Sequence, residues 1–252
     1  MDFTRKKYKI LLSAIQEAGY SFQTYSEFLE NPLDKVVILR HDVDLKPKNS
    51  LAFAEIQRAC GVKGVYYFRA VKASWDESII LKIKELGHEI GYHYENLSVS
   101  KGKLDLAYED FICNLAKLRK LAPVHTICMH GSPLSRYDNK NLWKQYDYKS
   151  MGIKGEPYFD TDFSKVCYLT DTGRTWDNKG ISVRDKVEST FNVKFSKTNQ
   201  LIESFQKEQM PPVIMFTFHP QRWTDNPIEW VLELVLQKVK NNIKRWLIRR
   251  SD

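Results

Sequence analysis

The stretch from residue 36 to residue 44, VVILRHDVD, decides how the whole chain is interpreted. Its continuous apolar start is typical of a strand that is buried on both faces of a parallel sheet. The strand is expected at 36–41, and two carboxylates, Asp42 and Asp44, follow it one residue apart. Like charges at the end of a buried strand cost free energy unless a cation lies between or beside them. This stretch therefore predicts a parallel α/β fold with a metal site, although either aspartate alone could cap a helix or form a surface salt bridge.

Strand-length apolar runs alternate with segments of helical periodicity along the rest of the chain, which is the pattern of an α/β barrel. A chain of 252 residues has the length at which such barrels form a single domain. Two helical pieces, at 3–18 and 24–30, precede the first strand, so we expect an N-terminal helical extension over 1–33 packed on a barrel over 34–252. Further strands are expected at 64–70, 88–94, 124–130, 149–153, 166–170 and 213–219, helices at 49–60, 77–86, 104–121, 141–148 and 228–247, and the longest loop at 171–196.

The charge of the chain suits an anionic partner, with a formal net charge of +8 and a pI of about 9.1. The excess gathers in RKKYK (5–9) and KVKNNIKRWLIRR (238–250), with no zinc finger, RGG repeat or stacking-aromatic motif beside either. We therefore expect solvated basic helix faces and no specific nucleic-acid partner. The last helix carries an apolar stripe at 231, 235, 239, 243 and 246/247, expected to pack on the barrel, with peripheral membrane contact through its basic end as the alternative.

The cysteines and the start of the chain bear on its compartment. Cys60, Cys113, Cys128 and Cys167 lie far apart in the sequence, with no CxxC pair. Neither a zinc knuckle nor a disulfide framework is indicated. The first fifteen residues are amphipathic, and their apolar run is too short for a signal peptide or a membrane anchor. The expected location is the cytoplasm, where thiols stay reduced.

Histidines gather where strands are expected to end. In a parallel α/β barrel the active site lies at the carboxyl ends of the strands, and His41, His93, His130 and His219 fall at or near such ends. Together with the two aspartates, His93 is the best ligand candidate. Neutral imidazole binds metal and imidazolium donates a proton, so His130 and His219 could each do either. A role at the substrate rather than at the metal is favoured for His219.

These segments resemble the polysaccharide deacetylase superfamily, also known as the NodB-homology group or carbohydrate esterase family 4, over most of residues 35–220. The resemblance implies an irregular (β/α)7 barrel of the polysaccharide deacetylase type. It also implies that Asp42 is the catalytic base and Asp44 a metal ligand, because the family's first motif is a strand ending in two acidic residues. GHEIG (87–91) followed by His93 matches the motif that supplies a metal histidine, and His219 matches the general acid at the end of the last strand.

Two departures from the family pattern concern the metal. The family normally supplies a second metal histidine four residues after the first, and Leu97 stands at that position. Its third motif normally carries Arg-Pro-Pro-Tyr after a strand, and here the strand ends in His130 followed by Gly-Ser-Pro. Either His130 replaces the missing ligand, with Glu95 as the alternative, or the metal is bound weakly or not at all.

A fourth motif of the family is similar to DTGRTWD (171–177), which carries an acidic residue, an arginine and a tryptophan. The resemblance implies that Arg174 holds Asp42 in its ionised form and is part of the catalytic set, and that Trp176 stacks on a sugar ring. The alternative is a loop in which the tryptophan is incidental. Arg222 and Trp223, which follow His219 closely, are further candidates for substrate binding.

The function implied is removal of an acyl group from a carbohydrate by a metal-dependent hydrolase, with a divalent ion, in this family commonly zinc. Asp44, His93 and His130 would hold the ion, Asp42 would take a proton from the attacking water, and His219 would protonate the departing amine or alcohol. The expected substrate is an acetamido sugar on a cytoplasmic precursor, such as a nucleotide-linked or lipid-linked saccharide, whose phosphates the positive charge would attract. The alternative is a catalytically inactive carbohydrate-binding protein on the same fold. A nucleic-acid-binding protein is the weaker rival.

Overall fold

The computed structural model describes residues 1–131, 135–176, 187–191 and 193–251, and side chains of the last helix as far as residue 242. Its centre is a curved sheet in which every pairing joins parallel strands. The strands lie in the order β5 (Val124–Met129), β4 (Glu89–Tyr94), β3 (Val65–Phe68), β2 (Val36–Val43), β7 (Val213–Phe218) and β6 (Cys167–Thr170), and β1 (Ser21–Gln23) pairs with β2. The parallel α/β fold expected from the sequence is confirmed.

The sheet curls into an incomplete barrel. Within the described ranges its outer strands, β5 and β6, do not pair with each other. An isolated parallel bridge between Thr126 and Gly155 adds a short piece of backbone to the β5 edge instead. The barrel is therefore irregular, as expected, and its open side is bordered by the segment between β5 and β6.

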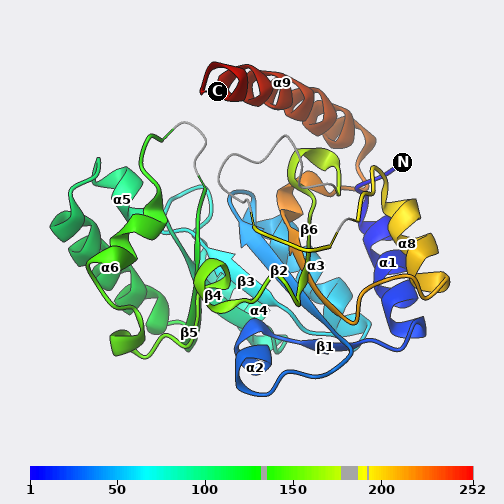
Figure 1. Cartoon of the computed structure of the whole chain (residues 1–252), viewed down its shortest axis with the longest axis horizontal. Helices are drawn as coiled ribbons and strands as arrows, with labels where there is room; N and C mark the ends of the chain where they lie inside the picture. Colours follow the sequence, from blue (N-terminus) through cyan, green and yellow to red (C-terminus); the bar gives the residue numbers. More distant parts are fainter. Residues whose placement is uncertain (132–134, 177–186, 192, 252) are drawn as a thin grey trace.

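Helices cover the outside of the sheet (Figure 1). The α-helices are α1 (Arg5–Glu17), α2 (Tyr25–Glu30), α3 (Pro47–Ala59), α4 (Glu77–Glu85), α5 (Asn96–Val99), α6 (Leu104–Arg119), α7 (Pro157–Asp160), α8 (Thr198–Gln206) and α9 (Pro227–Ser251). Short 3-10 turns are η1 (Asn139–Lys144), η2 (Lys149–Met151), η3 (Thr172–Arg174) and η4 (Pro220–Arg222). Most helices follow a strand and return the chain to the start of the next one, as parallel pairing requires.

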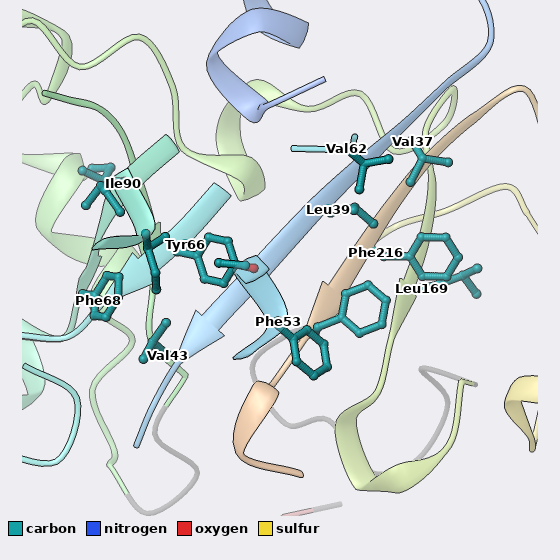
Figure 2. Close-up of a cluster of buried hydrophobic side chains, with 14 of the residues drawn as sticks. Val37, Leu39, Val43, Phe53, Val62, Tyr66, Phe68, Ile90, Leu169 and Phe216 are labelled. Carbon is teal, nitrogen blue, oxygen red and sulfur yellow. The ribbon is translucent and has the colours of Figure 1, made fainter. Parts of the chain in front are cut away.

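The alternation of side chains along β2 separates two apolar clusters. Val36 and Ile38 point into the barrel, where they belong to a cluster that includes Tyr67. Val37 and Leu39 point outward, into the larger core between the sheet and the helices (Figure 2). All eight residues of β2 are buried, which explains why its first four residues are all apolar and do not alternate with polar ones.

Several elements differ from the sequence pattern. Residues 21–23, expected within a helical extension, form β1 and pair with the first residues of β2, so part of the 1–33 segment lies within the sheet. The strand expected at 149–153 is wrong, because Lys149–Met151 form a 3-10 turn that ends at Gly152 with φ 73°. Helix α8 was not predicted; its amphipathic sequence follows a long polar stretch and buries Leu201 and Phe205.

The last helix, α9, lies along the opposite side of the molecule from β1 and α2 (Figure 1). It is held by Trp230, whose Nε1 donates to the Asp2 carbonyl (2.6 Å), and by Asn241, whose Nδ2 donates to the Gly173 carbonyl (3.0 Å). Its apolar stripe does not pack on the barrel, because Val231, Val235 and Val239 are each more than half exposed. The expectation is wrong for these positions, and the side chains at 243 and 246/247 lie outside the described ones. No helix in the described part of the chain is both long enough and apolar enough to cross a membrane.

Candidate active site

The carboxyl end of β2 carries the first part of the site. Arg40 and Asp42 follow Val36 and Ile38 on the inner side of the strand, so the interior of the barrel changes from apolar to charged toward this end. His41 faces the other way, stacked on Tyr66 with 4.1 Å between ring centroids. Burial lowers the pKa of His41 to about 3, which keeps the ring neutral in the core. His41 is therefore a structural residue, although it follows the same strand-end pattern as the site histidines.

Asp44, His93 and His130 come together at the mouth of the barrel. Asp44 Oδ1 lies 3.6 Å from His93 Nε2 and 3.5 Å from His130 Nε2. Ligand atoms around one tetrahedral zinc ion lie about 3.3–3.6 Å apart, given bonds of roughly 2.0–2.2 Å. Asp44 Oδ1 is also buried without a hydrogen bond. The three side chains therefore fit a divalent cation, which would satisfy that oxygen.

Neighbouring groups turn both imidazoles toward this position. His93 Nδ1 lies 2.9 Å from the Cys128 carbonyl oxygen, which can only accept a hydrogen bond, so Nδ1 carries the proton and Nε2 the lone pair. His130 Nδ1 lies 2.9 Å from Glu95 Oε2, a carboxylate oxygen that likewise accepts a hydrogen bond from Nδ1. Hydrogen bonds of this kind orient metal-binding histidines in proteins. Both Nε2 atoms are thereby prepared as ligands.

Glu95 supports His130 rather than taking its place. Its carboxylate is held by Arg69, whose Nη2 lies 2.7 and 2.8 Å from the two oxygens. Burial raises the pKa of Glu95, but the hydrogen bond from His130 and the charges of His130 and Arg69 outweigh it and lower the value to about 2. Leu97 is buried in α5. The structure thus brings His130, and not Glu95, to the position left without a ligand by Leu97.

Arg40 keeps Asp42 ionised. Its Nε and Nη2 donate to the two oxygens of Asp42 at 2.8 and 2.7 Å, and both side chains are buried. Burial raises the pKa of Asp42, but the Arg40 charge, followed by that of His93, outweighs it, so the pKa is lowered. Asp42 Oδ2 lies 3.7 Å from His93 Nε2. Asp42, His93 and Cys128 form a second potential metal group, which shares His93 with the first.

The expectation that Arg174 holds Asp42 is wrong in this structure. Arg174 Nη1 donates to the Arg222 carbonyl, and its guanidinium lies over the rings of Phe3 and Trp230. A residue two positions before Asp42 on the same strand necessarily shares its side of the sheet. That alternation pointed to Arg40, whereas the resemblance to a family motif pointed to a loop.

His219 is paired with Asp171, which the sequence analysis did not select as a site residue. His219 Nδ1 lies 2.6 Å from Asp171 Oδ1, and the His219 backbone N–H donates to Oδ2 at 2.9 Å. Asp171 also accepts hydrogen bonds from Arg222 Nη1 (2.9 Å) and Trp223 Nε1 (2.7 Å). Burial raises the pKa of Asp171, but the charges of His219 and Arg222 outweigh it and lower the value. His219 Nε2 is left facing the site, 3.9 Å from Asp44 Oδ2.

Neither tryptophan expected at the substrate is accessible. Trp176 is fully buried against Phe3 and Phe216, and its Nε1 donates to Thr198 Oγ1 at 3.1 Å. Trp223 is equally buried and supports Asp171. The sugar-stacking role expected for Trp176 and the substrate-binding role expected for Trp223 are therefore wrong in this structure, because both side chains belong to the core beneath the site. Asp177, from the same motif, lies outside the described residues.

A cavity of about 350 Å³ opens above the cluster of Asp44, His93 and His130. Asp42, Asp44, His93, His130 and His219 line its floor. Lys46, Arg222 and Lys240 add positive charge to its walls, so Arg222 is the one member of the expected substrate-binding set that reaches the cavity. Glu233, Leu236, Gln237 and Lys240 of α9 form its outer side.

Glu156 lies buried below the site and is expected to make stability depend on pH. It accepts hydrogen bonds from the backbone N–H groups of Met129 (2.9 Å) and Tyr158 (2.6 Å). Burial raises its pKa from 4.5 to about 7. Between these values the folded protein keeps a proton that the unfolded chain releases, so stability falls as pH rises through this window, by about 3 kcal/mol in all.

Urea unfolding at about pH 5 and pH 8 measures this contribution. The side chain of Glu156→Gln cannot titrate, so the loss of about 3 kcal/mol in unfolding free energy between the two pH values should be absent in this variant. This difference does not depend on how stable the variant is at pH 5. An equal decrease in both proteins would show that Glu156 is ionised in the fold.

Several solved structures are similar to this chain. One is a CE4 family esterase from Streptococcus mutans, with 14% identity, 91% of this chain and 90% of that chain covered, and a TM-score of 0.45. Another is a CE4 family pseudoenzyme from Bacillus anthracis, with 12% identity, 85% of this chain covered and a TM-score of 0.45. This chain spans only 63% of the length of that protein. A family 4 carbohydrate esterase from Bacillus subtilis has 14% identity, 90% and 82% coverage and a TM-score of 0.42.

Comparison with family models and with curated proteins finds no match.

Proposed function

We propose that this protein is a metal-dependent hydrolase that removes an acyl group from a carbohydrate. The observation that carries the proposal is the arrangement of Asp44, His93 and His130 around one point, with Asp42 on one side and His219 on the other. Ligands, a base and an acid are then within reach of a single substrate group. The motifs that resemble the polysaccharide deacetylases contain Asp42, Asp44, His93 and His219 in the family's chain order, and His130 lies outside that pattern.

Asp44, His93 and His130 would hold the divalent ion, and zinc suits a set of one carboxylate and two imidazoles. When bound, such an ion polarises an acyl carbonyl and makes water more acidic. The buried positions of Asp42 and His93 limit the access of bulk water on the barrel side of the cluster. Charge interactions at such a site are stronger than in solvent.

Two protons have to move in acyl transfer to water. Asp42, kept as a carboxylate by Arg40, takes the proton of the attacking water. His219 gives a proton to the departing nitrogen or oxygen through Nε2, while Asp171 holds Nδ1 and stabilises the protonated ring. The acyl group leaves as a carboxylic acid and the sugar keeps an amine or a hydroxyl. Arg222 helps to fix the carboxylate of Asp171.

The substrate proposed is an acetamido sugar on a glycan precursor that carries phosphate, either as a nucleotide or as a lipid phosphate. Lys46, Arg222 and Lys240 at the cavity support the phosphate, because they place three cations around an otherwise acidic floor. A cavity of about 350 Å³ has room for one sugar ring and its acyl group.

The proposal is tested with protein stripped of metal and then loaded with zinc. Bound zinc is measured by elemental analysis, and acetate release is measured with nucleotide-linked, lipid-linked and oligomeric acetamido sugars. We expect one zinc per chain and acetate release that stops with a chelator and returns with zinc. Failure to bind any divalent ion would contradict the proposal. Zinc and sugar binding without acetate release would instead favour a non-catalytic carbohydrate-binding protein.

A further inference from the structure

We propose that α9 docks this protein on an anionic lipid surface, and that the sugar entering the cavity is carried on a lipid phosphate in that surface. The docking of α9 on a lipid surface is independent of the function proposed above. The lipid-linked substrate rests on that proposed function.

One face of α9 is apolar and exposed. Its side chains recur at intervals of three and four residues, so they lie along one side of the helix. They are between 52% and 73% exposed and comprise Ile228, Val231, Leu232, Val235, Leu236 and Val239. Other large exposed apolar residues of the described chain are spread over several elements. We call these six residues the apolar face of α9; contiguous patches of this kind mark interaction surfaces.

The charge of α9 favours anionic lipid as the occupant. Residues 227–251 contain six lysines and arginines and two glutamates, and every cation follows residue 237. An apolar face with cations beside it, here the exposed Lys238 and Lys240, is typical of a helix that lies in the plane of a membrane, where basic residues strengthen binding to anionic lipid. A second copy of this chain would bring two proteins of formal charge +8 together. Lipid headgroups neutralise that charge instead.

The other side of α9 faces the cavity. Glu233, Gln237 and Lys240 line it, and Leu236, at the edge of the apolar face, also reaches it. Gln237 is 3% exposed, whereas Val235 in the same turns is 54% exposed. A membrane in contact with the apolar face would therefore lie next to the opening of the cavity. A sugar joined to a lipid through phosphate could enter while its lipid stays in the membrane, with the phosphate near Lys240.

Flotation with vesicles tests the docking. The full chain is mixed with vesicles of phosphatidylglycerol and phosphatidylcholine in a ratio of about 30:70, or with phosphatidylcholine alone. We expect binding to the anionic vesicles that weakens with salt, and little binding to the neutral ones. The double variant Val231→Glu/Val235→Glu is expected to bind at least about tenfold more weakly. The matched control, Leu106→Glu/Ile112→Glu, places the same charges on two exposed apolar positions of α6 and should bind as the native chain does.

Two results would overturn the docking. One is a failure of the vesicle assay, in which the α9 variant binds as well as its control or the native chain does not bind the vesicles at all. The other is a native dimer in sedimentation equilibrium that the α9 variant dissociates, which would assign the face to a second copy. His93→Ala should still float with the vesicles, so failure of the metal site and failure of docking are distinguishable.

The substrate half is tested with an acetamido sugar linked through phosphate to a polyprenyl lipid in the anionic vesicles. The α9 variant should deacetylate this substrate at least about tenfold more slowly than the control variant does. Both variants should deacetylate a water-soluble acetamido sugar at the same rate, because Val231 and Val235 do not line the cavity. Equal rates on the vesicle substrate would contradict lipid-borne presentation.

Discussion

Replacing His130 with alanine is expected to remove most of the bound divalent ion, while His125→Ala should leave it in place. His125 is exposed near the beginning of β5, whereas His130 follows the end of the same strand, where its Nε2 lies 3.5 Å from Asp44 Oδ1. Four-ligand zinc sites contribute about 10–16 kcal/mol, so one ligand of such a set is worth roughly 3 kcal/mol, or 10²- to 10³-fold in affinity.

Competition with a coloured zinc chelator measures the loss, with circular dichroism as the check on folding. Leu97→His in the His130→Ala background is a further comparison. It restores a histidine where the related family has one, but Leu97 is buried in α5, so we expect no recovery of affinity. Full zinc affinity in His130→Ala alone would show that His130 is not a ligand.

Replacing Asp171 with asparagine is expected to lower kcat by about 10³-fold while zinc content stays unchanged. Four groups surround the Asp171 carboxylate, and three of them, the His219 backbone N–H, Arg222 Nη1 and Trp223 Nε1, are hydrogen-bond donors. The fourth, His219 Nδ1, must also donate if the other ring nitrogen, Nε2, is to face the site. An amide has one oxygen, so its NH₂ group faces a donor in either orientation. His219 then loses both its orientation and the negative charge that stabilises its protonated form.

Trp223→Phe serves as the control, because it removes one of the four donors and keeps the carboxylate. Its kcat should fall far less than that of Asp171→Asn. Measuring kcat and KM separately, together with zinc content, separates a role in proton transfer from a general loss of structure. Equal kcat values for Asp171→Asn and the native protein would exclude His219 as an acid positioned by Asp171.

The parts of the site that the sequence predicted are those governed by local rules. Strand β2, the two acidic residues at its end and the positions of His93 and His219 follow from apolar run length and from the place where each run ends. The placement of Arg40 follows equally from strand alternation, but the resemblance to a family motif drew attention to Arg174 instead. Local patterns thus identified where the site is, and in this case a simple rule was more informative than a motif.

The remaining errors concern contacts between segments that are distant in the sequence. Asp171 reaches His219 only because its backbone N–H bonds to the Thr217 carbonyl across β6 and β7. Trp176 is buried by Phe3, which lies near the start of the chain. The charged residues next to Trp176 in the sequence therefore did not indicate whether its side chain is exposed. For α9, periodicity revealed an apolar face, but it could not specify whether the barrel or something outside the chain covers that face.

The placement of the three proposed ligands has a consequence for how the protein folds. Asp44 follows β2, His93 lies near the end of β4 and His130 follows β5, and β3 lies between β2 and β4 in the sheet. No single turn or hairpin contains two of them, so a partly folded chain has no preformed pair with which to capture zinc. The ion should therefore bind late, after the strands are paired, and stabilise only the native state, by an amount that grows with free zinc. Zinc uptake during refolding would then report completion of the sheet, a timing signal that a site built on one helix could not provide.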